Sequence, residues 1–160
     1  MNKTTRPKLT LKGGTAIIDA SGLILGRLAS HVAKRLLVGE EVIVINAEKA
    51  VISGGRKNII EEYKKSLSTR TLGSQTKAPK HSRRPETFIR RVIRGMVPWK
   101  KKARGKMAYG RLRVYIGLPE AFRESSVQTI PTARKAVRQF MTVGQLMELF
   151  GWKNPLKETS

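Results

Sequence analysis

The sequence contains no cysteine among its 160 residues. Structural disulfides, thiol catalysis and metal sites with cysteine ligands are therefore excluded, and the chain suits a reducing compartment. No apolar run approaches the roughly 18 residues that a membrane-spanning helix needs. The basic N-terminus, MNKTTRPKLTLKGG, also lacks the apolar segment of a signal peptide. We expect neither a membrane segment nor a secretion signal.

Acidic residues are also scarce. The chain has 11 Asp and Glu residues against 33 Lys and Arg residues, a formal net charge of +22 and a pI near 11.2. Self-repulsion of this size destabilises a compact chain, and binding to a polyanion relieves it. The aliphatic residues occur in runs, so this is not the composition of a disordered chain. The length then allows one domain with extensions, and we expect its partner to be acidic.

The positive charge is concentrated in one segment. Residues 14–52 carry four basic and four acidic residues, whereas residues 77–113 carry fourteen basic residues and only one acidic residue, Glu86. Residues 1–13 form a short basic N-terminal extension. The sequence therefore predicts a neutral body followed by a basic arm at residues 77–113.

The neutral body has the pattern of an alternating α/β unit. Apolar runs at 15–20 and 42–46 are typical of strands, and the second is typical of a strand covered on both faces. Gly39 stands where a helix cap is expected. Strand, helix and strand with short connections predict a right-handed parallel crossover. The intervening helix has apolar residues at helical spacing: Leu25, Leu28, Ala29, Val32 and Leu36.

The rest of the chain mixes helices with loops. Pro85 and Glu86 favour a helix start, and Thr142 with Gln145 matches a capping box. The loop at 68–84 has no periodicity, and we expect it to become ordered on a partner. The predicted segments are, in order, a strand at 50–53, a helix at about 57–67, the loop at 68–84, a helix at about 85–95, a loop at 99–113, a strand at 112–118 and a helix at 142–151.

The basic arm has the chemistry of a nucleic-acid surface. Too few carboxylates exist to pair with its cations, but a phosphate backbone can do so. Trp99 has two possible roles: stacking on a base, or the more usual packing at a helix end. The predicted RNA-binding residues are Arg56, Lys57, Lys77, Lys80, Arg83, Arg84, Arg90, Arg91, Arg94, Trp99, Lys100, Lys101, Lys102, Arg104, Lys106, Arg111 and Arg113.

The sequence lacks recognisable catalytic and cofactor motifs. The glycines of SGGRK, at 53–57, do not continue into the full phosphate-binding loop, and no dinucleotide fingerprint is present. His31 and His81 lack partners at ligand spacing, so we predict no metal site. Asp19, Ser21 and His31 have the residue types of a hydrolase triad without its Gly-x-Ser-x-Gly context, so helix capping by Asp19 and Ser21 is the simpler interpretation. We therefore expect no enzyme, no cofactor and no small-molecule substrate.

Several long motifs resemble the large-subunit ribosomal protein thirteen family, in the form found in archaea and the eukaryotic cytosol. They are IIDASGLILGRLAS, VAKRLLVGEEVIVINAEKAVISGGRK, RRPETFIRRVIRGMVPWKKKARG and LRVYIGLP, which occur in order between about residues 14 and 122. TVGQLMELFGW, near the C-terminus, resembles the archaeal branch.

This resemblance implies a three-layer α/β/α sandwich with a small, mainly parallel sheet and basic loop extensions. It divides the chain into the extension at 1–13, a ribosomal-protein domain at 14–122 that includes the arm, and a C-terminal extension at 123–160. It also implies a cytoplasmic, non-enzymatic protein of the large ribosomal subunit, with residues 90–104 in the family's RNA-facing region.

The implied partners are large-subunit rRNA, which the protein would help to fold, and neighbouring ribosomal proteins. We expect one copy per ribosome and no homo-oligomer. The alternative is a free-standing nucleic-acid-binding regulator, although the sequence has no helix-turn-helix or dimerising heptad to support it.

Overall fold

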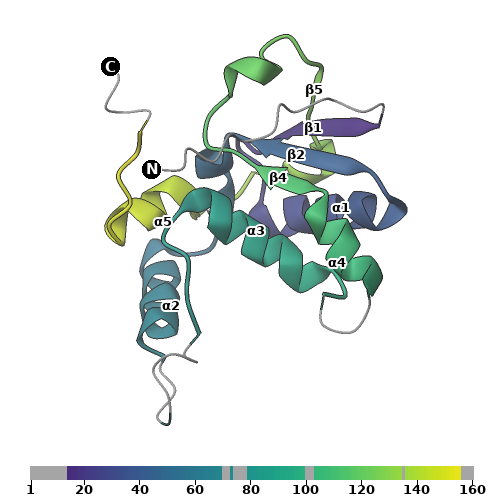
Figure 1. Ribbon diagram of the computed structural model, residues 1–160. Coiled ribbons are helices and arrows are strands. Elements are labelled where there is room, and N and C mark those ends of the chain that lie inside the picture. The colour runs from purple at the N-terminus through teal and green to yellow at the C-terminus, as the bar shows by residue number, and fades with distance from the viewer. Residues whose placement is uncertain (1–13, 70–72, 74–78, 100–102, 135, 156–160) are drawn as a thin grey trace, which may run out of the picture.

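The computed structural model describes residues 14–69, 73, 79–99, 103–134 and 136–155 (Figure 1). None of the helices in these ranges is both long and apolar enough to cross a membrane. The α-helices are α1 (Leu25–Val38), α2 (Arg56–Ser68), α3 (Pro85–Met96), α4 (Ala103–Gly110) and α5 (Val143–Leu149). The strands are β1 (Thr15–Asp19), β2 (Glu41–Ile45), β3 (Val51–Ser53), β4 (Leu112–Val114), β5 (Val127–Gln128) and β6 (Phe140–Thr142).

Four of the strands form a parallel sheet in the order β4, β2, β1, β5. β1 and β2 pair along their whole lengths, from Thr15 opposite Glu41 to Asp19 opposite Ile45. The short chain between them contains α1, so the predicted parallel crossover is confirmed. Both strands are apolar at consecutive positions because both faces of the sheet are covered.

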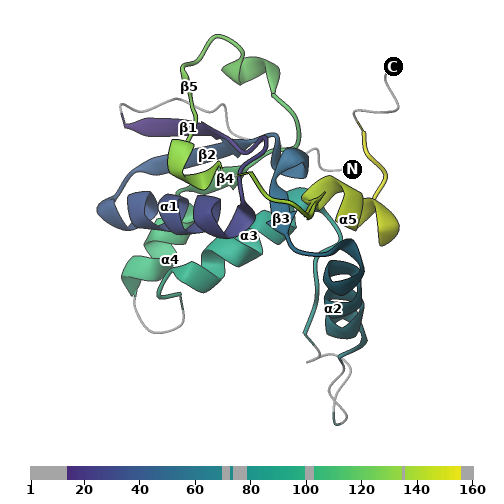
Figure 2. The same cartoon turned by 180° about the vertical axis from the view of Figure 1, so that it is seen from behind.

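One face of the sheet is covered by α1, α3 and α4 (Figures 1 and 2). The predicted apolar stripe of α1 is buried and packs against Ile18, Val42 and Val44 of the central strands. The helix ends at Gly39, whose φ of 117° lies in the left-handed region and whose N–H donates to the carbonyls of Arg35 and Leu36. The predicted cap is confirmed, and it turns the chain directly into β2.

The opposite face of the sheet has a thinner cover. Ile17, Ile43 and Ile45 pack there against Phe122, which belongs to the 3-10 turn Glu120–Phe122, and against half-buried Tyr115. The α/β class and the mainly parallel sheet are therefore confirmed. Within the described residues this outer layer is a single turn with its flanking chain, where the resemblance implies a full sandwich.

Residues 123–134 and 136–155 are part of the folded body. Their strand β5 extends the parallel sheet beside β1, and their strand β6 pairs antiparallel with β3. The predicted capping box is confirmed: Gln145 N–H donates to Thr142 Oγ1 over 3.2 Å, and Thr142 N–H donates to Gln145 Oε1 over 3.1 Å. α5 then buries Val143, Leu146 and Met147 in the core.

The predicted loop at 99–113 is wrong over much of its length, because residues 103–110 form α4. Gly105 explains why a helix fits there. A Cβ at this position would lie 2.4 Å from the carbonyl oxygen of Pro98, so only glycine allows α4 to pack directly on the turn after α3. The strand predicted at 112–118 is also shorter and ends at Val114.

Candidate functional site

Helix α3 is the element that organises the basic arm. Ile89 and Ile93, one turn apart, are fully buried against the core, and Pro85 at the first helical position is buried as well. Arg90 and Arg94 follow these residues by one position and are half-buried. The apolar stripe therefore fixes the direction in which the two arginines leave the body.

The two arginines pack on aromatic rings. The guanidinium carbon of Arg90 lies 5.3 Å from the ring centroid of Tyr109, and that of Arg94 lies 5.9 Å from the ring centroid of Trp99. The two rings contact each other edge to face, with centroids 4.9 Å apart. We call these four residues the arginine–aromatic cluster. Such contacts hold a guanidinium plane in place while its edge stays available to an anion.

The cluster changes the interpretation of Trp99. Its ring packs between Arg94 and Tyr109 within the protein, which is the structural role of the two that the sequence allowed. Tyr109, on α4, was not among the predicted site residues. The sequence gives little indication of its role, because Tyr109 is placed by α4, and the two glycines of that helix, Gly105 and Gly110, argued against predicting a helix there.

The end of the predicted loop, residues 79–84, is attached to the body. Tyr63 Oη donates to the carbonyl of Ser82, Ser66 Oγ is 3.0 Å from His81 Nδ1, and Arg91 donates to the carbonyl of Lys80. Burial raises the pKa of Tyr63, although the charges of Arg91 and Arg83 oppose this, so the hydroxyl remains a donor. We expected the loop at 68–84 to become ordered only on a binding partner. Residues 79–84 instead form hydrogen bonds within the chain.

Most of the described arm cations have no carboxylate beside them. Within the described part of the arm the one ion pair joins Arg84 to Glu86, with nitrogen and oxygen 3.1 Å apart. Arg104 donates to the carbonyl of Leu37 over 2.8 Å, and Arg111 is half-buried. The remaining described cations, all exposed, are Lys80, Arg83, Lys106 and Arg113.

Two surface depressions, each of about 460 Å³, adjoin α3. Lys80, Arg91, Arg94 and Tyr109 are among the residues that line the first. The second contains Arg84, Arg90 and Arg113 with only one acidic residue, Glu86. Six of the predicted residues thus line the two depressions beside α3. Lys77, Lys100, Lys101 and Lys102 lie outside the described residues.

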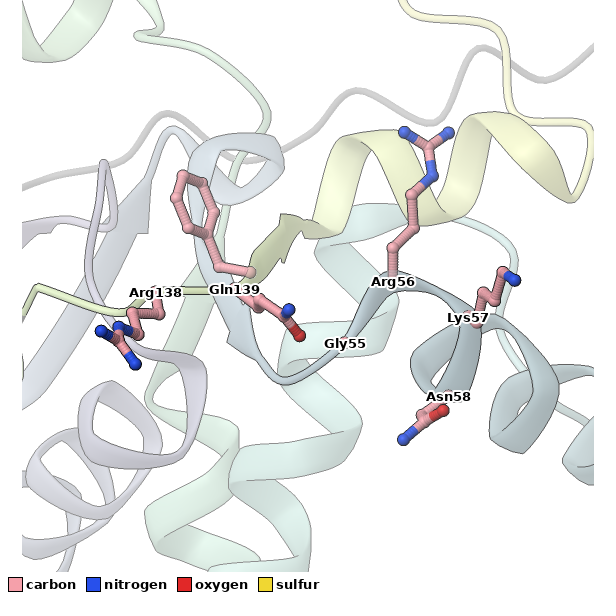
Figure 3. Close-up of a pocket in the computed structure, with 7 residues that line it drawn as sticks. Gly55, Arg56, Lys57, Asn58, Arg138 and Gln139 are labelled. Atoms are coloured by element: carbon pink, nitrogen blue, oxygen red, sulfur yellow. The ribbon is translucent and has the colours of Figure 1, made fainter.

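Arg56 and Lys57 lie apart from the arm. They begin α2 and, with Gly55 and Asn58, form one side of a cavity of about 580 Å³ (Figure 3). The other side consists of Arg138, Gln139 and Phe140, from a segment about eighty residues later in the chain. We did not predict the second segment, although three cations within five residues, Arg134, Lys135 and Arg138, gave a weak signal there.

Asp19 and Ser21 were expected to cap the first helix, and this prediction is wrong. Asp19 Oδ1 accepts from Ser21 N–H at 3.0 Å, from Ser21 Oγ at 2.8 Å and from Asn46 Nδ2 at 2.9 Å, whereas α1 begins at Leu25 without a side-chain cap. Asp19 therefore closes the turn before the helix. Burial acts to raise its pKa, but these hydrogen bonds and the charge of Lys49 outweigh burial and leave the pKa below its ordinary value.

The same geometry does not form a hydrolase triad. Ser21 donates directly to Asp19, and no hydrogen bond joins either residue to His31 in the described part of the chain. Across the described ranges, no three His, Asp or Glu residues gather closely enough to hold a metal ion.

Comparisons with known proteins give one family and several archaeal relatives. The model of the family described as ribosomal protein L13 matches residues 14–121. The large ribosomal subunit protein uL13 of Methanococcoides burtonii is 44% identical over 86% of this chain and 98% of its own length. Proteins of the same name from Archaeoglobus fulgidus and Aeropyrum pernix are 41% and 38% identical, over 90% and 94% of this chain and 92% and 100% of their own lengths. The chain therefore belongs to the ribosomal protein L13 family, as its motifs predicted, and is a structural protein of the large ribosomal subunit.

Proposed function

We propose that the chain binds large-subunit rRNA through the basic arm at residues 77–113 and helps the RNA to fold. The observation that carries this proposal is the charge of the arm, with fourteen basic residues against one acidic residue. Only one of its described cations, Arg84, is paired with a carboxylate within the described residues. A surface of this kind is most stable against a polyanion.

The proposed mechanism is electrostatic and steric. Cations that approach rRNA phosphates release condensed counterions, which supplies most of the affinity. The body sets the direction in which the arginines of α3 point. Ile89 and Ile93 anchor the helix in the core, and the rings of the arginine–aromatic cluster hold the guanidinium groups of Arg90 and Arg94. RNA segments held against such a preformed surface lose alternative conformations, and this is how binding would assist folding. No step makes or breaks a covalent bond.

The proposed contacts are the seventeen residues predicted from the sequence, with different roles. Exposed Lys80, Arg83, Lys106 and Arg113 can reach phosphates directly. Trp99 and Arg104 are engaged within the protein, so we assign them mainly to the support of the surface. Neighbouring ribosomal proteins are also proposed as partners, as is a single copy in each subunit.

The salt dependence of RNA binding tests this mechanism. If about eight phosphates are neutralised in duplex-like RNA, a plot of log affinity against log salt concentration should have a slope near −7. The measurement is a fluorescence-anisotropy titration of a labelled large-subunit rRNA fragment at several potassium chloride concentrations. A slope shallower than about −2 would contradict the mechanism, because fewer than three phosphates would then be involved.

A DNA duplex of equal length provides the control. At one salt concentration we expect the rRNA fragment to bind more tightly than the duplex DNA. Tighter binding to DNA would instead favour a free-standing regulator of nucleic acid.

A further inference from the structure

We propose that the cavity between the start of α2 and strand β6 is a second RNA site, which takes a single-stranded segment. Its phosphates would lie beside Arg56, Lys57 and Arg138, and one base would stack on the ring of Phe140. The inference rests on the proposed RNA-binding function and adds to it a separate surface and a different form of RNA.

The cavity is built from two segments that are locked together. β3 and β6 pair antiparallel, with Ser53 opposite Phe140. The chain then turns at Gly54, whose φ of 133° is a glycine conformation and whose N–H donates to the carbonyl of Gln139 over 3.0 Å. Figure 3 shows Arg138 and Gln139 on one side of the cavity and Arg56 and Lys57 on the other. The site is therefore preformed, and a ligand would not have to organise it.

The charge of the cavity favours an anion. Three of its seven lining residues are cations, and none is acidic. All three cations are exposed, and none of them forms an ion pair within the described part of the chain. The amide side chains of Asn58 and Gln139 add hydrogen-bond donors and acceptors, which can meet a ribose or the edge of a base.

The exposure of Phe140 indicates which kind of anion the cavity binds. Phe140 is a large apolar residue on a short strand, yet 55% of its surface is exposed. An exposed aromatic ring beside cations is the arrangement that binds single-stranded nucleic acid, because every base has a face that can stack. Bases inside a duplex are already stacked and do not offer that face. This is why we infer a single strand here and not a helix.

The position of the cavity gives it a role of its own. The start of α2 and helix α4 lie toward opposite ends of the molecule (Figures 1 and 2), and only residues 79–84 of the described arm run beside α2. A chain that binds RNA at both places would hold two RNA segments at a fixed separation. Once one segment is bound, the second binds at a raised effective concentration.

The test uses the full chain with two labelled probes, a short single-stranded oligouridylate and an RNA hairpin. Phe140→Ala should weaken oligouridylate binding about tenfold and leave hairpin binding unchanged, since loss of one stacked base has roughly that effect. Phe140→Tyr, which keeps an aromatic ring, should bind oligouridylate like the parent chain. Arg138→Ser should also weaken oligouridylate binding. The urea midpoint of each variant should match that of the parent chain, because both side chains are exposed.

Each other outcome has a distinct meaning. Equal oligouridylate affinity in Phe140→Ala and the parent chain, with normal hairpin binding, would overturn this inference and leave the proposed function intact. If the parent chain binds neither probe, both this inference and the proposed function are wrong. If poly-glutamate binding depends on Arg138 and Phe140 while oligouridylate binding does not, the occupant is an acidic protein segment and the inference is wrong.

Discussion

Replacing Arg83, Lys106 and Arg113 together with serine should weaken binding to large-subunit rRNA by roughly two to three orders of magnitude at 0.1 M salt. All three side chains are exposed, and none forms an ion pair within the described residues. Each would neutralise one phosphate, so the log–log salt slope should fall from about −7 to about −4.5. The same anisotropy titration measures both quantities. The free energy of unfolding should hardly change, since exposed substitutions usually alter it by less than about 0.5 kcal/mol.

A matched variant tests whether RNA affinity depends on the charges of the arm or only on the total charge of the chain. Lys34→Ser, Arg134→Ser and Lys153→Ser remove the same number of exposed charges from other elements. We expect this triple variant to lose far less affinity than the arm variant. Equal losses would show that binding depends on total charge, and the assignment of the arm as the contact surface would then be wrong.

Gly105→Ala should lower the free energy of unfolding by about 3 kcal/mol, at the upper end of the range for overpacked sites. The new Cβ would lie 2.4 Å and 2.5 Å from the carbonyl oxygen and carbon of Pro98. These are backbone atoms, which cannot rotate away as a side chain would, so α4 must move. In a chain of this length the melting temperature should fall by about 6–12 °C, and urea unfolding gives the free energy directly.

Gly110→Ala is the control in the same helix. A Cβ there has no atom within 4 Å, so the substitution should be neutral or stabilising by up to about 1 kcal/mol. Movement of α4 should also displace Tyr109 from Arg90, and we therefore expect Gly105→Ala to weaken RNA binding while Gly110→Ala does not. If Gly105→Ala is as stable as the parent chain, α4 does not pack on the turn as described.

The sequence predicted best where local pattern and burial agree. Leu25 to Leu36 repeat at helical spacing, and the apolar run of β2 is buried on both faces, so the β1–α1–β2 unit followed directly from periodicity. Thr142 and Gln145 specify a helix start through their own hydrogen bonds, which needs no distant partner. The arm at residues 77–113 was predicted from its count of basic and acidic residues alone.

The sequence failed where distant contacts decide the structure. α4 has two glycines and little amphipathic character, and it depends on its packing against Pro98 and α1. β5 is two residues long and β6 three, and each exists because it pairs with a strand far earlier in the chain. The arginine–aromatic cluster and the cavity at Phe140 arise from those same contacts. The sequence predicted Arg90, Arg94 and Trp99 of the cluster and Arg56 and Lys57 of the cavity, but it did not predict the distant residues that complete each of them.

Chemical labelling of lysines tests the central claim that the arm contacts rRNA. Intact large subunits and the isolated protein are acetylated under matched conditions, and the modified sites are quantified by mass spectrometry. Lys80 and Lys106 are exposed in the isolated chain and should be strongly protected in the subunit, with protection lost on ribonuclease digestion. Equal labelling of both lysines in subunit and isolated protein would contradict the account, because the arm would then face solvent.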